Sequence, residues 1–393
     1  SNGLEKRPRL AFRRTDGSSF PSWSRTSLSS IIEPYSEKVY GEHKYEVLTS
    51  SREGLQRQVD HFGTKQRHDT DGYNVIPFGY CTYRNRSDDG RFTFNINTIS
   101  SNAIVSKFYP VFRFTNANSL FMSEFLNSSS RAKKKLSVLA VGTSQVVLSF
   151  EALKAADFDL PCKDEQDKIA SFFECLNRRI EYQRTLVDAL KKYKRGVNKQ
   201  LLSQIDNSCN CRLGSVCEIV GGGTPDTLHT EYWGNTVEWF TPSEIGKTKY
   251  VNNSVRKLSD IGLDNSSAKL LPIGTVLLTT RATLGEMSIA KRECSTNQGF
   301  QSLIPHTDRV SSEYLYYMQI IIKPWCEKYA SGNTFREISK SALSDCIIPI
   351  PDRARQEQIV KLLSSIDMLI GAAESISMSL SKIRHGLMQQ LFI

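Results

Sequence analysis

Two long stretches of the chain place apolar residues at alternating steps of four and three positions. The first runs from position 169 to 201 and the second from 359 to 391. A period of 3.5 residues held over about five heptads favours a coiled coil over helices that are core elements of separate domains. The expected seam residues are Ile169, Phe173, Leu176, Ile180 and Leu190 in the first helix and Ile359, Leu363, Ile366, Ile370 and Leu380 in the second.

Polar residues interrupt both seams, and Lys194 and Arg384 do so at the same position of each helix. Buried polar residues in such seams commonly fix register or partner choice. A helix of about 40 residues forms a rod of roughly 60 Å. The simplest arrangement pairs the two rods antiparallel, so that they hold the rest of the chain apart. Pairing within one chain and exchange between two chains both remain open.

The two helices belong to an internal repeat. The stretches that begin at Pro161 and Pro351 stay in register without gaps at an offset of 190 (351 minus 161), so that Gln166 meets Gln356. The same offset extends upstream to position 142, and further upstream it slips to 195, where Pro77 meets Pro272. The chain is therefore one unit written twice, and each copy is a mixed region followed by a long helix.

Each mixed region alternates short β-type runs with turn signals and helical stretches. Runs such as 80–83, 92–95 and 276–280 predict strands, and the stretches around 119–135 and 311–329 predict helices. We therefore predict an α+β fold with two tandem mixed α/β domains, separated by two long helices that form an antiparallel coiled coil. The expected boundaries are 1–159 and 207–349 for the mixed domains and 160–206 and 350–393 for the helices.

The charge balance points to a polyanionic partner. Lysine and arginine outnumber aspartate and glutamate by 51 to 41, and this surplus suits nucleic acid. No apolar stretch approaches the ~20 residues of a membrane-spanning helix, and no secretory signal precedes the basic residues near the N-terminus. We therefore expect double-stranded DNA as a partner, no membrane, and a cytoplasmic location.

No catalytic or metal-binding constellation is recognisable. The nine cysteines include no CxxC pair, and the six histidines are scattered. Gly246-Lys247-Thr248 lacks the earlier glycine of a phosphate-binding loop, because Thr241 stands there. The chain also has no Pro-Pro pair, which an adenine amino-methyltransferase needs, and no Glu-x-Lys after its Pro-Asp pairs, which a Mg²⁺-dependent nuclease needs. We predict no catalytic residue, no metal and no cofactor in this chain.

Candidate DNA contacts fall at equivalent positions of the two copies. Arg86 and Arg281 follow β-type runs, and arginine can read guanine through two hydrogen bonds, although a structural ion pair or a turn explains them equally well. Two groups of lysines could clamp phosphates, and the first group could also be a solvated helix end. The equivalent loops near 144 and 334 differ in sequence, so the two copies would read different bases. The candidates are Arg84, Arg86, Lys133, Lys134, Lys135, Ser144, Gln145, Lys247, Lys249, Thr279, Thr280, Arg281, Asn333, Thr334 and Arg336.

Several motifs together resemble one family. The stretch Leu271-Pro-Ile-Gly-Thr-Val-Leu-Leu-Thr-Thr-Arg-Ala-Thr-Leu-Gly285, Thr296-Asn-Gln-Gly299, Gly222-Gly-Thr-Pro225 and the helix end Gly-Leu-Met-Gln-Gln-Leu-Phe392 are similar to the specificity (S) subunit of Type I restriction–modification systems, the HsdS family. The likeness covers almost the whole chain. The first mixed region departs most, since it lacks the Gly-Gly-Thr-Pro and Asn-Gln-Gly signatures.

This resemblance implies a DNA reader without turnover of its own. Two target recognition domains, 1–159 and 207–349, would each bind one half of a bipartite asymmetric site, and two spacer helices, 160–206 and 350–393, would set the gap. The helices would dock two methyltransferase (M) subunits, which bind S-adenosylmethionine and flip an adenine. Restriction/translocase (R) subunits would join, and ATP and Mg²⁺ are expected in the partner subunits.

Two other classes of function compete with this interpretation. One is a DNA-modifying enzyme, a methyltransferase or nuclease with an unrecognised active site. The other is a structural scaffold that dimerises through the coiled coil. Specific DNA protection by the chain with its partner would exclude the scaffold.

Overall fold

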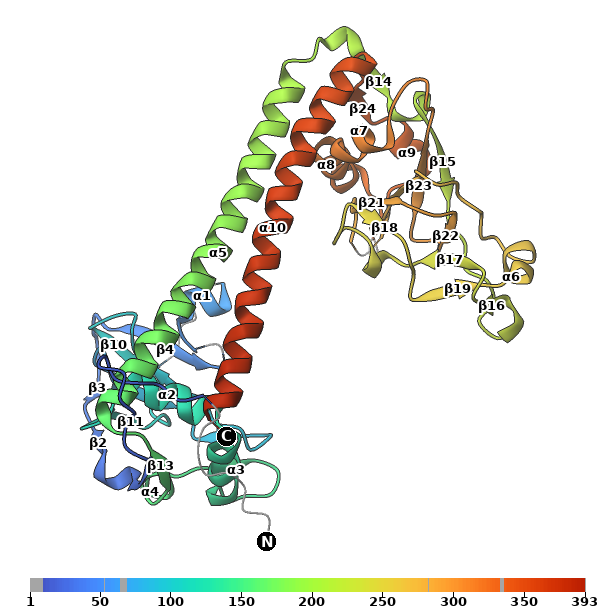
Figure 1. Ribbon diagram of the computed structural model, residues 1–393. Helices are drawn as coiled ribbons and strands as arrows, with labels where there is room; N and C mark the ends of the chain where they lie inside the picture. The colour runs from blue at the N-terminus through green and yellow to red at the C-terminus, as the bar shows by residue number, and fades with distance from the viewer. Residues whose placement is uncertain (1–9, 53, 64–68, 282, 333–335, 393) are drawn as a thin grey trace. The chain divides into compact units, whose positions relative to one another are not determined.

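The computed structural model describes residues 10–52, 54–63, 69–281, 283–332 and 336–392 (Figure 1). The chain divides into two compact units, one made of Ser1–Gln183 with Ser375–Ile393 and the other of Arg184–Glu374. The long helices α5 (Lys163–Ser203) and α10 (Arg353–Leu391) each contribute residues to both units. None of the helices in the described part of the chain is both long and apolar enough to span a membrane.

The mixed domain of the first unit contains two sheets. The four-stranded sheet has the order β2-β11-β7-β9, formed by Ile32–Tyr35, Val111–Phe114, Cys81–Tyr83 and Phe94–Ile96. The five-stranded sheet has the order β3-β6-β10-β4-β5, formed by Lys38–Val39, Tyr73–Val75, Ala103–Val105, Glu46–Ser51 and Gly54–Arg57. Two shorter pairs are β1 (Ser24–Ser27) with β13 (Asp157–Leu160) and β8 (Arg86–Ser87) with β12 (Val146–Val147). The helices are α1 (Gln58–Phe62), α2 (Ser119–Ser128), α3 (Ser130–Leu139), α4 (Phe150–Lys154) and the 3-10 turn η1 (Leu28–Ser30).

The mixed domain of the second unit has the same organisation. One sheet has the order β15-β23-β20-β21-β18, formed by Cys217–Gly221, Gln301–Pro305, Val276–Leu278, Met287–Ala290 and Tyr250–Val251. The other has the order β16-β19-β17-β22, formed by Trp233–Gly234, Arg256–Leu258, Val237–Phe240 and Cys294–Thr296. A further pair joins β14 (Asn210–Arg212) to β24 (Ile347–Pro349). The helices are α6 (Asp260–Asp264), α7 (Ser312–Tyr317), α8 (Gln319–Tyr329) and α9 (Lys340–Ser344), with 3-10 turns η2 (Asn207–Cys209), η3 (Leu213–Ser215), η4 (Thr230–Tyr232) and η5 (Pro242–Glu244).

The predicted internal repeat and α+β fold are confirmed by this topology. The order β2-β11-β7-β9 in the first unit recurs as β15-β23-β20-β21 in the second. Helices α4 and α9 begin 190 residues apart (340 minus 150), and each is capped by a serine whose hydroxyl accepts from a backbone amide, Ser149 from Ala152 and Ser339 from Ala342. Serine is preferred at this position because it satisfies one of the free amides of the first turn.

A buried glutamine at the start of each long helix explains why the Pro-x4-Gln spacing recurs. The Gln166 amide donates to Pro161 O at 2.9 Å and its carbonyl accepts from the Asn118 amide at 2.9 Å. Gln356 makes the same two bonds, to Pro351 O at 3.0 Å and from the Ser311 amide at 3.2 Å. Because Asn118 and Ser311 cap α2 and α7, each glutamine joins a long helix to the mixed domain beside it.

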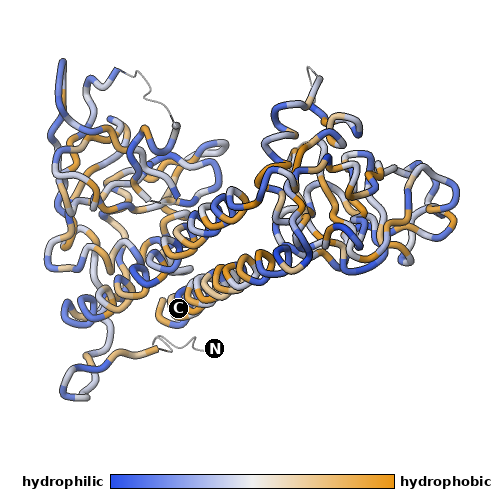
Figure 2. The backbone as a smooth tube through the Cα atoms, turned by 90° about the horizontal axis from the view of Figure 1, so that it is seen from above, coloured by the Kyte–Doolittle hydropathy of each residue, from blue (hydrophilic) through white to orange (hydrophobic). Residues whose placement is uncertain are grey.

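The two long helices run antiparallel within each unit, as predicted. In the first unit the Arg384 side chain donates to Asn177 Oδ1 at 2.5 Å, and in the second the Lys194 ammonium lies 2.5 Å from Asp367 Oδ1. The alternation of hydrophobic and hydrophilic positions along both helices is visible in Figure 2. Seven of the predicted seam residues are buried, namely Ile169, Phe173, Ile180, Ile359, Leu363, Ile366 and Ile370, and Leu176, Leu190 and Leu380 are half-buried.

The seam residues also belong to the cores of the mixed domains. Ile169 and Phe173 share a buried cluster with Phe121 of α2 and with Phe392 just beyond α10, whose ring centroid lies 5.8 Å from that of Phe121. Ile359 and Leu363 share another cluster with Tyr314 of α7. The coiled coil and the globular cores are therefore continuous, because one helix face serves both.

We expect Gln356→Leu to destabilise the protein by about 1–3 kcal/mol, because the Ser311 amide and the Pro351 carbonyl lose their partner in a buried place. The measurement is the free energy of unfolding in urea. The control is Gln358→Leu, an exposed glutamine two residues further on the same helix. Equal effects of the two substitutions would contradict the role given to Gln356.

Candidate nucleic-acid interface

Four arginines gather around a hollow in the first unit. Arg84, between β7 and β8, and Arg86, the first residue of β8, line a cavity of about 120 Å³ together with Arg52 and Arg91. The lining also includes Asp88 and the hydroxyl side chains of Ser50, Ser51, Ser87 and Thr93. We call this site the arginine hollow. Its guanidinium groups are suited to phosphates and to guanine edges.

Two of these arginines share one carboxylate partner. Asp89 lies 2.7 Å from Arg52 and 3.9 Å from Arg91, measured between carboxylate oxygen and side-chain nitrogen. A hydrogen bond from the Ser87 hydroxyl and the neighbouring arginines lower the pKa of Asp89. Among the described residues no carboxylate pairs with Arg84 or Arg86, and the Arg86 guanidinium lies 5.5 Å from the centroid of the Phe108 ring. Both side chains are exposed, so their donors are accessible to a ligand.

The predicted loop around Ser144 lies beside the arginine hollow. Gln145 Nε2 donates to Asp88 Oδ1 at 3.0 Å, and Val147 pairs with Arg86 between β12 and β8. A Cβ at Gly142, whose φ is +139°, would approach Gln145 O to 2.3 Å, so the tight turn requires glycine there. The structure thus brings together Arg84, Arg86, Ser144 and Gln145, which are separated by about 60 positions in the sequence.

The equivalent loop of the second unit meets Arg281 differently. Arg281 Nε lies 2.9 Å from a carboxylate oxygen of Glu337, which stands 190 residues (337 minus 147) after Val147. Arg281 therefore makes a structural ion pair, which was one of the alternatives that the sequence allowed. Arg336 is exposed and donates to Glu327 O, whereas the candidates Asn333 and Thr334 lie outside the described residues.

Two candidate threonines lie inside the protein. Thr279 and Thr280 are fully buried. The Thr279 hydroxyl donates to Thr283 O, and the Thr280 amide donates to Gly299 O at 2.8 Å. These contacts hold the turn before Gly285 and leave neither side chain at a surface.

The candidate lysines divide into exposed and engaged groups. Lys133, Lys134 and Lys247 are exposed. Lys135 forms an ion pair with Asp157 and also donates to its backbone carbonyl at 2.8 Å. Lys249 donates to Tyr317 Oη and to Ser364 Oγ, both at 3.1 Å, and burial lowers its pKa.

Arg52 and Arg91 were not predicted from the sequence. Arg91 directly follows the Asp-Asp-Gly turn. Its closeness to Arg86 in the sequence could have identified it as a further candidate. Arg52 lies in the turn between β4 and β5, and only the tertiary fold brings it to Asp89.

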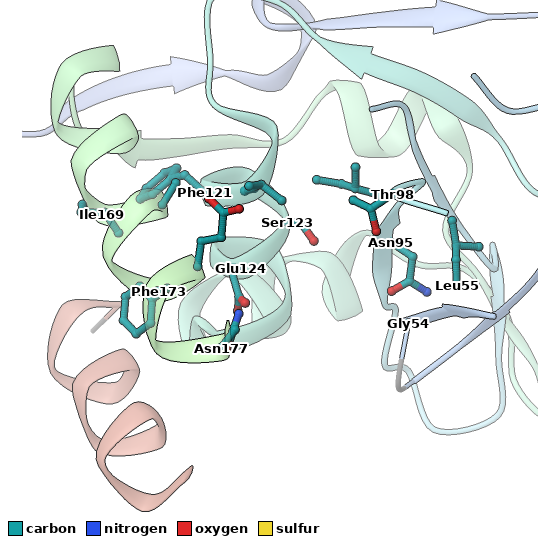
Figure 3. A pocket seen from close by; sticks show the side chains of 14 residues that line it. Gly54, Leu55, Asn95, Thr98, Phe121, Ser123, Glu124, Ile169, Phe173 and Asn177 are labelled. Atoms are coloured by element: carbon teal, nitrogen blue, oxygen red, sulfur yellow. The ribbon is translucent and has the colours of Figure 1, made fainter. Parts of the chain in front are cut away.

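A second hollow in the first unit has the opposite character (Figure 3). It has a volume of about 310 Å³ and is lined by residues of β5, β9, α2 and α5, including Glu124 and Glu174. We call this site the acidic hollow. Glu124 is paired with Arg384 at 2.5 Å, and neither lysine nor arginine is among the lining residues, so this hollow is not part of the candidate nucleic-acid interface. Within the described ranges, no three histidine, cysteine, aspartate or glutamate side chains are grouped as metal ligands would be.

Comparison with known proteins gives consistent matches. Residues 33–192 and 206–378 match the family model of the Type I restriction modification DNA specificity domain. The chain is 35% identical over 186 residues to the Type I restriction enzyme MjaIX specificity subunit of Methanocaldococcus jannaschii. This match covers 46% of this chain and 43% of that protein. It is 25% identical over 228 residues to the EcoR124I/EcoR124II specificity subunit of Escherichia coli, covering 53% of this chain and 55% of that protein. The match therefore spans about half the length of these curated relatives.

Two solved structures share the fold over nearly the whole chain. The S subunit of a Type-I restriction-modification system from M. genitalium superposes with a TM-score of 0.56 at 15% identity and covers 98% of this chain and 99% of that chain. A chain from a structural study of complex assembly and conformational transition in the type I R-M system gives a TM-score of 0.59 at 19% identity, covering 95% and 98%.

We expect Lys135→Met to lower the melting temperature at pH 7, because Asp157 loses its ammonium partner. Lys135 and Arg25 lower the pKa of Asp157 from its ordinary value of 3.8, so the stabilisation is complete above that value and is lost as the pH falls through the lowered pKa. Thermal unfolding at pH 7 and at pH 3 measures this. Lys134→Met, on the exposed side of α3, is the control and should leave the melting temperature unchanged. A deficit that stays constant with pH would contradict the ion-pair explanation.

Proposed function

The chain belongs to the Type I restriction modification DNA specificity family, and from this premise we propose that it is the subunit that recognises a bipartite, asymmetric DNA site. Each mixed domain reads one half of the site in this proposal. The support comes from the arginine hollow, where Arg84 and Arg86 present uncommitted guanidinium groups beside the loop of Ser144 and Gln145.

The two halves of the site differ because the two domains differ in chemistry. At the position where the first domain exposes Arg86, the second binds Arg281 to Glu337. An arginine already held by a carboxylate is less available to a base than one without an acidic partner. The two domains therefore share a fold but offer different hydrogen-bond donors to DNA. This difference favours an asymmetric site over a palindrome.

The long helices set the number of unread bases between the halves. Helices α5 and α10 are continuous over 41 and 39 residues, and their polar seam contacts tie them in one register. A stiff element of fixed length gives a fixed spacer.

The catalytic steps belong to partner subunits. Two methyltransferase subunits dock on the helices and supply S-adenosylmethionine chemistry, and restriction/translocase subunits supply ATP- and Mg²⁺-dependent steps. The chain itself performs no turnover and acts in the cytoplasm. A DNA-modifying enzyme is the alternative, and methyl transfer by the isolated chain would favour it.

The proposal is tested by selecting binding sequences from a random DNA library, with the chain alone and with its cognate methyltransferase subunit. A split motif, two short defined blocks around a gap of constant length, is the expected result. A single contiguous motif would contradict the two-reader arrangement. No enrichment with the partner at low salt would overturn DNA reading altogether.

The arginine hollow gives a sharper test. Arg84→Ala or Arg86→Ala is expected to cost about 1–3 kcal/mol of affinity and to relax the preference in one half of the motif, if the side chain reads a base. If it binds a phosphate, affinity falls for all sequences and the slope against salt drops by about 1. The control is Arg113→Ala, an exposed arginine of the same domain that is held by Glu33 at 2.7 Å. Unchanged affinity and salt dependence in both hollow variants would exclude the hollow as a DNA contact.

A further inference from the structure

Lys249 is a half-buried lysine that lies in the turn before β18 and contacts a long helix. Its ammonium donates to Tyr317 Oη of α7 and to Ser364 Oγ of α10, at 3.1 Å in both cases. It also lies 4.5 Å from the centroid of the Tyr317 ring. Burying an ammonium costs free energy unless hydrogen bonds replace its water, so these contacts hold the side chain in place.

These contacts continue to the ion pair between the two long helices. The Tyr317 hydroxyl donates to Asp367 Oδ2 at 2.7 Å, and the ammonium of Lys194 lies 2.5 Å from Asp367 Oδ1. Lys194 belongs to α5 and Asp367 belongs to α10. Lys249 therefore connects β18, the last strand in the order of its sheet, to both long helices.

The backbone around Lys249 is bound to the sheet of the second domain. Thr248 O accepts from the Ser288 hydroxyl at 2.7 Å, and Lys249 O accepts from the Ile289 amide at 2.8 Å. The chain continues as β18, which pairs in parallel with β21. Because the sheet holds the backbone of Lys249 and the helices hold its side chain, any shift of the domain along α10 acts directly on the side-chain contacts.

The same turn carries a candidate DNA contact, the exposed Lys247. At the offset of 195 it corresponds to Arg52 (247 minus 52), which lines the arginine hollow. The fold agrees with this correspondence. In the first unit Asn95 of β9 donates to Ser51 O at 2.9 Å, next to Arg52, just as β21 binds the turn before β18 in the second. The segment that Lys249 holds therefore presents the second domain's counterpart of an arginine-hollow residue.

In the first unit a glycine stands in place of this lysine. Lys249 corresponds at the same offset to Gly54 (249 minus 54), and Ser364 corresponds at the offset of 190 to Glu174 (364 minus 174). Gly54, which is labelled in Figure 3, and Glu174 both line the acidic hollow of about 310 Å³. A cavity therefore occupies the place in the first unit where the Lys249 side chain reaches from the turn to α10 in the second.

We propose that Lys249 is a positioning residue, which fixes the DNA-reading surface of the second domain at one place along α10 and so enforces the length of the unread gap. The inference rests on the proposed function, because it assumes a DNA site of two halves. Lys249 itself contacts neither base nor phosphate in this proposal and acts through the turn that carries Lys247. The first domain, with Gly54 at this position, depends on its other contacts with the long helices, such as that of Glu124 with Arg384.

The distances show that these contacts can discriminate a single base pair. Successive base pairs are about 3.4 Å apart along DNA. The Lys249 ammonium lies 3.1 Å from each hydroxyl, and a contact longer than about 3.5 Å is no longer a hydrogen bond. A domain that moved along α10 by the length of one base pair would therefore break both hydrogen bonds. A gap of the wrong length is disfavoured because the ammonium loses its partners.

The test compares DNA duplexes that carry the two selected blocks with the selected gap and with gaps one base pair shorter and longer. The dissociation constant of each duplex is measured for the full chain with its cognate methyltransferase subunit, and the readout is the ratio of the constant for a changed gap to that for the selected gap. Lys249→Met removes the ammonium, and Ser364→Ala removes its acceptor on α10. Each is expected to lower this ratio at least threefold. Thermal unfolding of each variant checks that the fold is intact.

The matched control is Lys323→Met, which removes another half-buried lysine of the same domain, one that pairs with Glu286 at 2.5 Å and not with a long helix. It should change the ratio less than twofold. An unchanged ratio in both Lys249→Met and Ser364→Ala, whatever their melting temperatures, would overturn the inference and leave the proposed function standing. Affinity that falls by the same factor at every gap would overturn it too. Absence of DNA binding, or of any gap preference, in the unchanged chain would contradict the proposed function itself.

Discussion

The charged nitrogens inside the helix seam fix how the two long helices are aligned. The side chains of Lys194 and Arg384 are only 22% and 28% exposed, and an ion left without a partner in such a place costs several kcal/mol. The opposite helix must therefore present an acceptor at the matching position along the seam. The acceptor is Asp367 for the lysine and Asn177 for the arginine. Apolar seams tolerate a slide by one heptad, whereas these contacts do not. The antiparallel register follows from them.

The same nitrogens join the helices to the mixed domains. Arg384 reaches Glu124 of α2, and Lys194 lies 5.1 Å from the ring of Tyr317, whose hydroxyl donates to Asp367 at 2.7 Å. Glu124 and Tyr317 are equivalent in the repeat, because the caps of α2 and α7 lie 193 residues apart (311 minus 118) and bind equivalent glutamines. One pseudo-symmetric set of contacts thus fixes helix to helix and helix to domain within each unit.

The helices, their seams and the repeat could be predicted from the sequence because they depend on periodicity, which is a local property. The meeting of Arg84 and Arg86 with the loop of Ser144 and Gln145 could be anticipated only through the repeat. The fate of the other candidates depended on tertiary packing. Lys135 forms an ion pair with Asp157 of β13. Lys249 donates to Ser364 of α10, which lies more than one hundred residues away in the sequence. Residue type and spacing alone cannot tell a solvated lysine from one with such a partner.

The division of the chain has a consequence for its synthesis. The second unit is continuous in sequence, from Arg184 to Glu374, whereas the first requires the stretch from Ser375 onwards. Phe392 packs against Phe121 and Phe125, with ring centroids 5.8 and 5.6 Å away. At about 5–20 residues per second, a ribosome needs roughly 10–40 s to make the intervening residues. During that interval Phe121 and Phe125 of α2 lack the part of their cover that Phe392 supplies. The two halves of the protein are therefore completed in the reverse of their order in the sequence.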